Sequence, residues 1–227
     1  MRPQILLVLA ATVAFAACSS DDNNGVEPGS LASVRFINAT GTNLDLSTNG
    51  VVSTGNSNIA FGGRSACLSV NPSSPGLVVN RAGTTTVMPG LVPAFTSGGN
   101  FTVIAFPGAD GTTQFATLTN AFTPTTGSGG LRVFNAASGA GNLDAFVMRP
   151  GAALGTMSAS NIGFGSGSAF FNVPAGVQDV EFTNAGTKTV ALDAGNSTFT
   201  AGSNALVVIA PPAPGSTTLR AFTTTGC

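Results

Sequence analysis

The sequence contains no histidine, tyrosine or tryptophan among its 227 residues. Without histidine there is no Ser–His pair to activate a nucleophile, no imidazole metal ligand, and no side chain whose unperturbed pKa lies near neutrality. Charged residues make up only 7% of the chain, against roughly a quarter in ordinary globular domains. The 8 basic residues are scattered, whereas nucleic-acid binding needs clustered Lys and Arg to neutralise phosphates. These absences exclude histidine-based catalysis and argue against a nucleic-acid partner.

Carboxylates and cysteines offer few other routes to catalysis. Asp179 and Glu181 would share one strand face at roughly 6 to 7 Å, and paired carboxylates can hydrolyse glycosides. They also lie beside a hairpin that contains Lys188, and the first half of the chain has Gly76 and Val78 at these places. We therefore interpret them as a solvated, salt-bridged strand face. The sequence has no calcium loop, phosphate-binding glycine loop or cysteine metal cluster, so we expect no cofactor and no enzymatic activity.

In place of charge, the chain has apolar, hydroxyl, amide and glycine residues. Apolar residues make up 43% and there are 30 glycines. A disordered chain has high charge and few apolar groups, so disorder is not expected. Threonine suits pleated strands, and glycine and asparagine suit turns. Because long runs of helix formers are absent after residue 17, the composition predicts an all-β protein.

The first 17 residues resemble a bacterial export signal. Arg2 gives a positive start, and Ile5 to Ala16 form an uninterrupted stretch of apolar and small residues. That stretch is too short to cross the roughly 30 Å of a bilayer core, but it has the length of a signal-peptide core. Polar residues come after it without a stop-transfer pattern. We predict a signal peptide over residues 1–17 and a polar tether over residues 18–30.

The residues around Cys18 predict a lipid anchor. Phe15-Ala16-Ala17-Cys18 resembles a lipobox, in which small residues precede the cysteine that carries the lipid, although Phe15 stands where Leu is usual. Acyl chains on Cys18 would hold firmly, since each buried methylene contributes about 0.8 kcal/mol. Ser19 at the next position favours the outer membrane. We expect an exported lipoprotein of the cell envelope with the membrane as a partner; the alternative is an ordinary secretory signal with an incidental cysteine.

The two halves of the chain repeat the same motifs in the same order, at offsets that drift only from 97 to 105 residues. The pairs are Val34–Ala39 with Leu131–Ala136, Asn43–Asp45 with Asn142–Asp144, Asn58–Gly62 with Asn161–Gly165, Ala82–Thr84 with Ala185–Thr187, and Val103–Ala105 with Val208–Ala210. Five ordered matches are hard to assign to composition alone. We therefore predict two tandem domains, residues 31–122 and 130–227, joined by a linker over residues 123–129.

Each half has the features of short strands joined by tight turns. Val34 and Phe36 alternate with Arg35, and Asn184-Ala185-Gly186 separates two apolar runs as a hairpin does. About seven such strands per half fit a sandwich or a small barrel. We expect two all-β sandwiches, immunoglobulin-like or transthyretin-like, and the sequence leaves their strand order open.

These motifs resemble the bacterial domain of unknown function 4397. The resemblance rests on the Val-Arg-Phe-Ile-Asn-Ala opening, the Leu-Asp strand, the Asn-Ile-Ala-Phe-Gly turn and the Ala-Gly-Thr hairpin, with counterparts in both halves. There are two departures: Asn38 and Asn135 replace a histidine common in the family, and the Pro-Asp-Ala-Pro-like turn is Thr40-Gly41-Thr42 or Ser138-Gly139-Ala140 here. The resemblance implies a β-sandwich and an envelope location, and it implies no activity.

Arg35 with Arg132, and Asp45 with Asp144, are the charges that recur in both halves. A functional interpretation is a polar site that is present twice. A structural interpretation is an Arg–Asp pair, or two separate solvated ends, that ties the first two strands of each domain. We favour the structural interpretation.

Cys67 and Cys227 remain once Cys18 is lipidated. An oxidising envelope favours a disulfide between them, and the chain-entropy estimate for so long a loop is about 5 kcal/mol. In the repeat, Cys67 corresponds to Phe170 and Cys227 falls near the place of Phe122, so the bond would cross between the domains. The alternative is a buried thiol and a free tail thiol.

These expectations favour a non-catalytic envelope lipoprotein with a structural, adhesive or scaffolding role, which contacts itself or an envelope protein through sheet faces or edges. The alternative is a surface module that binds a glycan or a peptide. Glycan sites use exposed aromatic rings, and Phe95, Phe115 and Phe199 are the candidates. Packing inside a core without tryptophan is the competing explanation for these rings.

Overall fold

The structure is a computed structural model that describes residues 30–213 and 215–227, and every helix or strand that it assigns in those residues is a β-strand. The all-β prediction is confirmed. No helix in the described residues is long and apolar enough to cross a bilayer. The predicted signal peptide, Cys18 and the tether up to residue 29 lie outside the described residues.

Seven strands between residues 32 and 119 form two sheets, which we call unit 1. The strands are β1 (Ala32–Asn38), β2 (Leu44–Thr48), β3 (Val51–Val52), β4 (Leu68–Val70), β5 (Leu77–Arg81), β6 (Asn100–Pro107) and β7 (Thr113–Thr119). One sheet has the order β4-β1-β6-β7, with β1 parallel to β6, and the other has the order β3-β2-β5. Buried side chains of both sheets, among them Phe36, Leu46 and Val103, form one core between them. Unit 1 is therefore a β-sandwich.

Nine strands between residues 128 and 225 form a second pair of sheets, unit 2. The strands are β8 (Ser128–Asn135), β9 (Leu143–Met148), β10 (Ala159–Ile162), β11 (Ser166–Gly167), β12 (Phe171–Pro174), β13 (Gly176–Asn184), β14 (Val190–Phe199), β15 (Asn204–Ala210) and β16 (Arg220–Thr225). One sheet has the order β11-β8-β15-β16, with β12 also on β8 and β8 parallel to β15; the other has the order β10-β9-β13-β14. Val133, Phe182 and Ile209 belong to the core between them.

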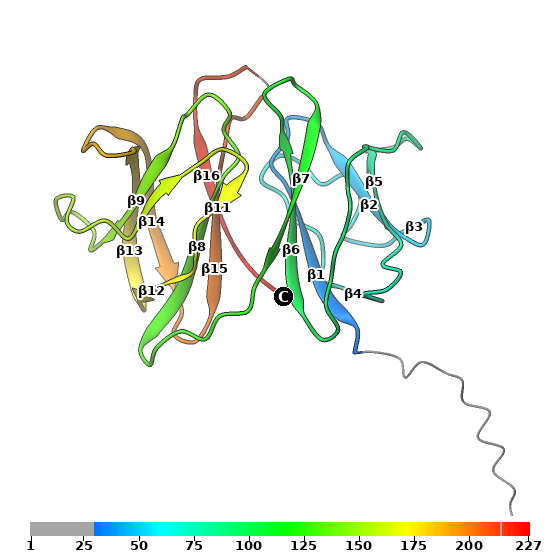
Figure 1. The fold of residues 1–227 in the computed structure, drawn as a ribbon, viewed down its shortest axis with the longest axis horizontal. Helices are drawn as coiled ribbons and strands as arrows, with labels where there is room; N and C mark the ends of the chain where they lie inside the picture. Colours follow the sequence, from blue (N-terminus) through cyan, green and yellow to red (C-terminus); the bar gives the residue numbers. More distant parts are fainter. Residues whose placement is uncertain (1–29, 214) are drawn as a thin grey trace, which may run out of the picture.

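The two units stack into four layers (Figure 1). The β1-containing sheet and the β8-containing sheet lie in the middle, and each uses the face turned away from its own sandwich core. We call this interface the junction; its buried apolar residues are Ile37, Ala39, Ile104, Phe106, Phe134, Ala136, Leu206, Val208 and Ala210. Burial on both faces explains why β1 and β8 have two adjacent apolar residues just before their final asparagine, rather than strict alternation.

The pairing register corrects one of the five repeat matches. Val103 lies opposite Phe36, and Val207 lies opposite Val133, the residue that corresponds to Phe36. Val103 therefore corresponds to Val207 and not to Val208. The difference matters because a slip of one residue exchanges the two faces of a strand: Val103 and Val207 face the sandwich cores, whereas Val208 belongs to the junction.

The connection between the units covers residues 120–127, earlier in the chain than the predicted linker, because β7 ends at Thr119 and β8 already includes Ser128 and Gly129. Its residues are held against unit 2: the Thr125 amide donates to Asn172 Oδ1 over 2.8 Å, and the Phe122 ring stacks on Phe170 at 5.1 Å between centroids. Gly130 comes next in β8, where a Cβ atom would come within 2.3 Å of Asn204 Oδ1. Whether the sandwiches are immunoglobulin-like or transthyretin-like stays a prediction.

Candidate functional site

The two recurring arginines lie at the junction, each beside the last strand of the other unit. Arg35 Nη1 donates to the carbonyl oxygen of Thr225 over 2.6 Å, and Arg132 Nη1 donates to that of Thr119 over 2.9 Å. Burial lowers the pKa of both guanidinium groups, and the nearby charge of Arg64 lowers the pKa of Arg35 further. Arginine stays charged in proteins, so each forms a charge-assisted bond across the junction. The two contacts are related by the repeat.

Beside each arginine, a second contact joins the two units. The two contacts occupy corresponding places in the repeat but differ in chemistry. Cys67 forms a disulfide with Cys227, with 5.7 Å between the Cα atoms. Phe170, the counterpart of Cys67, instead stacks on Phe122, and the Arg132 guanidinium lies 4.8 Å from the Phe170 ring centroid. Both contacts join a residue near the first strand of one unit to the segment after the last strand of the other. The disulfide joins the two units, as the alignment of the two halves of the sequence predicts for a bond between these cysteines.

The two recurring aspartates do not pair with the arginines in the structure. Asp45 accepts hydrogen bonds from the backbone amides of Asn58 (2.6 Å) and Gly83 (2.8 Å). Asp144 accepts from Asn161 and Gly186, both at 2.7 Å. The predicted Arg–Asp pairs are therefore wrong, and so is the idea of solvated ends, because Asp45 and Asp144 are only 9% and 4% exposed. Each carboxylate instead ties two segments to the second strand of its unit: the segment that contains Asn58 or Asn161, and a hairpin.

The repeated Asn-Ile motif is explained by this arrangement. Asn58 and Asn161 have positive φ angles of 51° and 55°, a conformation that asparagine tolerates better than most residues. Their amides point to the aspartates, and their side chains accept hydrogen bonds from Asn43 and Asn142. The carboxylates therefore hold these two positive-φ residues in place.

Replacing Asp144 with asparagine is expected to lower the free energy of unfolding by about 1–3 kcal/mol, because one buried amide would lose its acceptor and face an NH₂ group instead. Asp193→Asn is the matched control, since Asp193 is exposed and accepts from the Gly195 amide two residues further along β14. Urea unfolding of both variants measures the difference. Equal, small effects of the two substitutions would show that the Asp144 hydrogen bonds contribute little.

Two buried asparagines, Asn38 and Asn135, occupy corresponding places in the two units. Asn38 donates to the carbonyl oxygens of Thr42 and Ile59, both at 2.7 Å, and Asn135 donates to those of Gly141 (2.9 Å) and Ile162 (3.1 Å). Both side chains are 0% exposed. Their amides act as fixed links between neighbouring segments.

The carboxylates on β13 lie on the outer face of unit 2. Glu181 lies opposite Asp193 on β14, and Asp179 lies opposite Asn196. Lys188 does not bridge them in the structure: its Nζ lies 4.5 Å from the Phe146 ring centroid and donates to Gly155 O over 2.9 Å. The predicted salt bridge is therefore wrong. Burial raises the pKa of Glu181, and the negative charges of Asp193 and Asp179 raise it further.

When folding raises the pKa of a glutamate, the side chain favours the folded state at pH values below its pKa in the unfolded chain, about 4.3. This contribution to stability is lost as the pH rises through the pKa in the folded chain. We expect Glu181→Gln to be slightly more stable than the parent at pH 7 and equal to it near pH 3. The gain is small because solvent screens this half-exposed group. Urea unfolding at the two pH values measures it, and a variant less stable than the parent at pH 7 contradicts the explanation.

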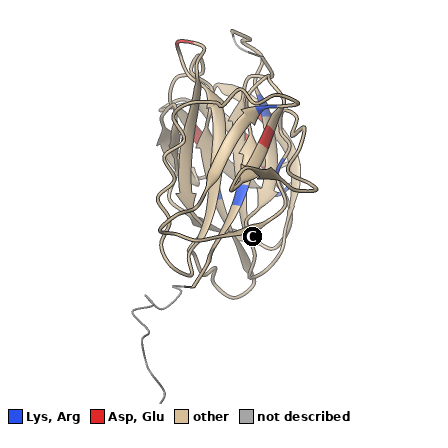
Figure 2. Cartoon of the chain, turned by 90° about the vertical axis from the view of Figure 1, so that its right-hand side faces the viewer, with Lys and Arg blue, Asp and Glu red and all other residues tan. Residues whose placement is uncertain are grey.

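Charged groups do not gather into a catalytic or metal-binding cluster in the described residues. Figure 2 shows how few positions carry a charge, and no group of three His, Cys, Asp or Glu residues in the described part of the chain could hold a metal ion. Two of the three phenylalanines considered for a glycan platform, Phe95 and Phe199, are 8% and 3% exposed, and Phe115 is half-buried. Packing is therefore the better explanation of these rings.

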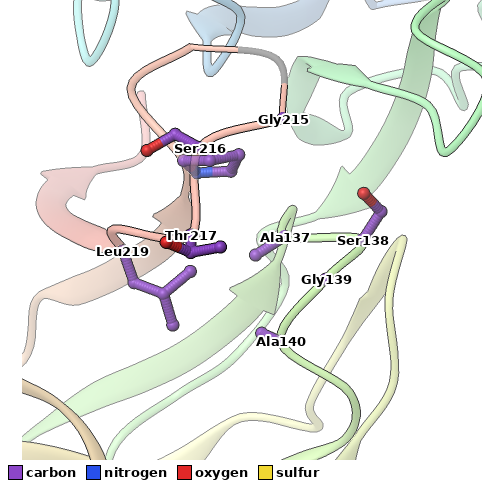
Figure 3. Close-up of a pocket in the computed structure, with 9 residues that line it drawn as sticks. Ala137, Ser138, Gly139, Ala140, Gly215, Ser216, Thr217 and Leu219 are labelled. Carbon is purple, nitrogen blue, oxygen red and sulfur yellow. The ribbon is translucent and has the colours of Figure 1, made fainter.

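Cavities are the remaining candidates. One of about 180 Å³ lies between the β8–β9 loop and the β15–β16 connection, with Ala137 and Ala140 on one side and Thr217 and Leu219 on the other (Figure 3). The connection between β15 and β16 is longer than its counterpart in unit 1, where residues 108–112 join β6 to β7. None of the residues that line this cavity is charged. A second cavity, of about 390 Å³, lies beside Cys227.

The recurring residues can be recognised in the sequence, but the junction that several of them serve was not predicted. Phe61 packs edge-on against Phe222, and Phe164 packs edge-on against Phe106, each across the junction. A usable indication was present in Phe36-Ile37 and Val133-Phe134, where adjacent apolar residues in a strand predict burial on both faces.

Comparison with known families is consistent with these motifs. A family described as Domain of unknown function (DUF4397) matches residues 10–146, more than half of the chain. The match includes the β1 motif, Asp45, the Asn58 turn and the start of unit 2. No curated protein matches the chain. The chain belongs to the DUF4397 family.

Proposed function

We propose that the protein is an exported lipoprotein of the cell envelope, with two copies of the family domain that together serve as a non-catalytic scaffold or adhesive module. The leader and Cys18 motivate the export and the lipid anchor. The observation that carries the scaffolding role is the junction, in which apolar packing, two arginine contacts and a disulfide hold the units together. Such ties favour a rigid body over two domains on a flexible linker.

The arrangement of the ends supports this role. The start of β1 and the C-terminus lie toward the lower end of the stack in Figure 1, whereas the connection between β15 and β16 lies at the upper end. With a lipid on Cys18, the short tether would bring the lower end to the membrane and present the upper loops away from it. We propose those loops, residues 137–140 and 215–219, as the contact region for an envelope protein.

Cys18→Ser tests the anchor. In cells fed with an alkyne-labelled palmitate, the parent chain is expected to carry the label and to sediment with membranes, and the variant to carry none and to appear in the soluble fraction. Cys67→Ser is the matched cysteine control and is expected to keep the label. A Cys18→Ser chain that stays labelled and membrane-bound contradicts the proposal.

A photo-crosslinking residue at Ser216 tests the contact region. It is expected to yield a defined adduct with an envelope protein in intact cells, whereas the same residue at Thr198, on the outer strand β14, is expected to yield none. An absence of adducts from Ser216, Ser138 and Thr217 alike contradicts a scaffolding role through these loops.

The alternative is a module that binds a peptide or a glycan, and the cavity in Figure 3 is the observation that favours it. Its uncharged lining of small residues suits a short peptide better than a sugar, because no aromatic ring lines it. Binding in a peptide library that is lost in Thr217→Trp, which fills the cavity, would favour this alternative over the scaffold.

A further inference from the structure

The disulfide that joins the units is open to solvent. Cys67 and Cys227 are both exposed, although a structural disulfide of this span would be better protected inside the junction. Exposed disulfides are the ones most accessible to attack by a thiolate. Its position therefore raises the question of which sulfur an incoming thiol would reach.

The two sulfurs have different surroundings. Arg35 Nη2 lies 2.9 Å from Cys67 Sγ, and this is the only hydrogen bond to either sulfur among the described side chains. The guanidinium is held in place by its second contact, to Thr225 O. A fixed positive charge stabilises a thiolate, so negative charge that develops on Cys67 as the bond breaks is favoured over negative charge on Cys227. Cys67 is therefore the better leaving group.

The space for an attacking group lies on the side of Cys227. A cavity of about 390 Å³ has Cys227 in its wall and does not have Cys67. Its other lining residues are polar or glycine: Asn100, Asn120, Gly202, Ser203, Asn204, Thr225 and Gly226. Amide and hydroxyl groups of this kind offer both donors and acceptors, which suits a small ligand that itself carries amide groups.

We propose that this disulfide is a thiol-exchange site, at which a small polar thiol seated in the Asn-lined cavity attacks Cys227 Sγ and Cys67 leaves as the thiolate. The incoming thiol loses its proton to solvent and its sulfur forms a bond to Cys227 Sγ. The Cys67–Cys227 bond breaks, and its electron pair goes to Cys67 Sγ beside Arg35. One disulfide is exchanged for another, so the step needs no separate oxidant or reductant. Its product is a chain that carries the small thiol on Cys227 and a free thiolate on Cys67.

Reduced glutathione is a suitable probe, because it is a polar thiol with two amide groups. The full chain with Cys18→Ser is mixed with glutathione at pH 8, quenched with acid, and digested for peptide mass spectrometry. We expect the mixed disulfide on Cys227 in clear excess over Cys67. Arg35→Gln is expected to slow the exchange by roughly three- to tenfold, as weaker stabilisation of the leaving thiolate predicts, and Arg35→Lys to retain most of the rate.

Arg132→Gln is the matched control, since Arg132 makes the same contact across the junction but lies over Phe170 instead of a sulfur. Its exchange rate is expected to equal that of the parent. Asn100→Leu is expected to slow exchange with glutathione and to leave exchange with ethanethiol unchanged. The proposal is overturned by a mixed disulfide that forms at least as often on Cys67, by an Arg35→Gln chain that exchanges as fast as the parent, or by equal slowing in Arg132→Gln.

Discussion

Replacing Cys67 and Cys227 together with alanine is expected to lower the free energy of unfolding by about 3–5 kcal/mol, one of the two largest effects we predict. The disulfide closes a loop across a sequence separation of 160, so its loss restores much conformational freedom to the unfolded chain. It also removes a covalent tie between the units. Urea unfolding of the Cys18→Ser chain with and without the two alanines measures the effect.

Thiol counting provides the control for this experiment. In the Cys18→Ser chain, denatured without reductant, no free thiol is expected. Two free thiols would show that Cys67 and Cys227 are not bonded, and the expected loss of stability would then have no cause. An alanine variant as stable as the parent, in a chain with no free thiols, would contradict the role assigned to the disulfide.

Phe134→Ala is expected to lower the free energy of unfolding by about 3–5 kcal/mol, because it removes a large side chain from a fully buried site. Phe134 is 0% exposed, lies in the junction and packs edge-on against Phe106 of unit 1 at 5.3 Å between ring centroids. Its loss leaves a cavity between two sheets that are each fixed by their own sandwich core. The effect is measured by urea unfolding monitored by circular dichroism.

Phe115→Ala is the matched control for Phe134→Ala. Phe115 is half-buried on the edge strand β7 and packs against the core of unit 1 rather than in the junction. Phe115→Ala is expected to lower the free energy of unfolding by less than half as much as Phe134→Ala. Equal costs at the two positions would mean that the junction contributes no more than a partly exposed contact.

The strands and the repeat could be predicted from local sequence, because both depend on patterns that neighbouring residues carry. Alternating apolar residues, glycine turns and the five matched motifs can each be recognised in a few neighbouring residues. In the structure, four of the five motif pairs occupy corresponding places in the two units. The fifth, at β6 and β15, is shifted by one residue. Runs such as Val103-Ile104-Ala105 are apolar at every position, so their pattern does not reveal which face each residue occupies.

The roles of the recurring charges could not be predicted, because they depend on how distant segments meet. Arg35 finds its acceptor at Thr225, 190 residues away, and nothing local indicates that contact. Asp144 satisfies two backbone amides, one in β10 and one in the hairpin between β13 and β14, which is a frequent use of a buried carboxylate but leaves no sequence pattern. The repeat showed that these residues matter to both units, and only the fold showed how.

Scanning calorimetry of the oxidised Cys18→Ser chain tests the central claim, that the junction makes one body of the two sandwiches. A single transition whose calorimetric enthalpy equals its van't Hoff enthalpy is the predicted result, because both units then unfold together. Two transitions, or a calorimetric enthalpy about twice the van't Hoff value, would show that the units unfold independently and would contradict the claim.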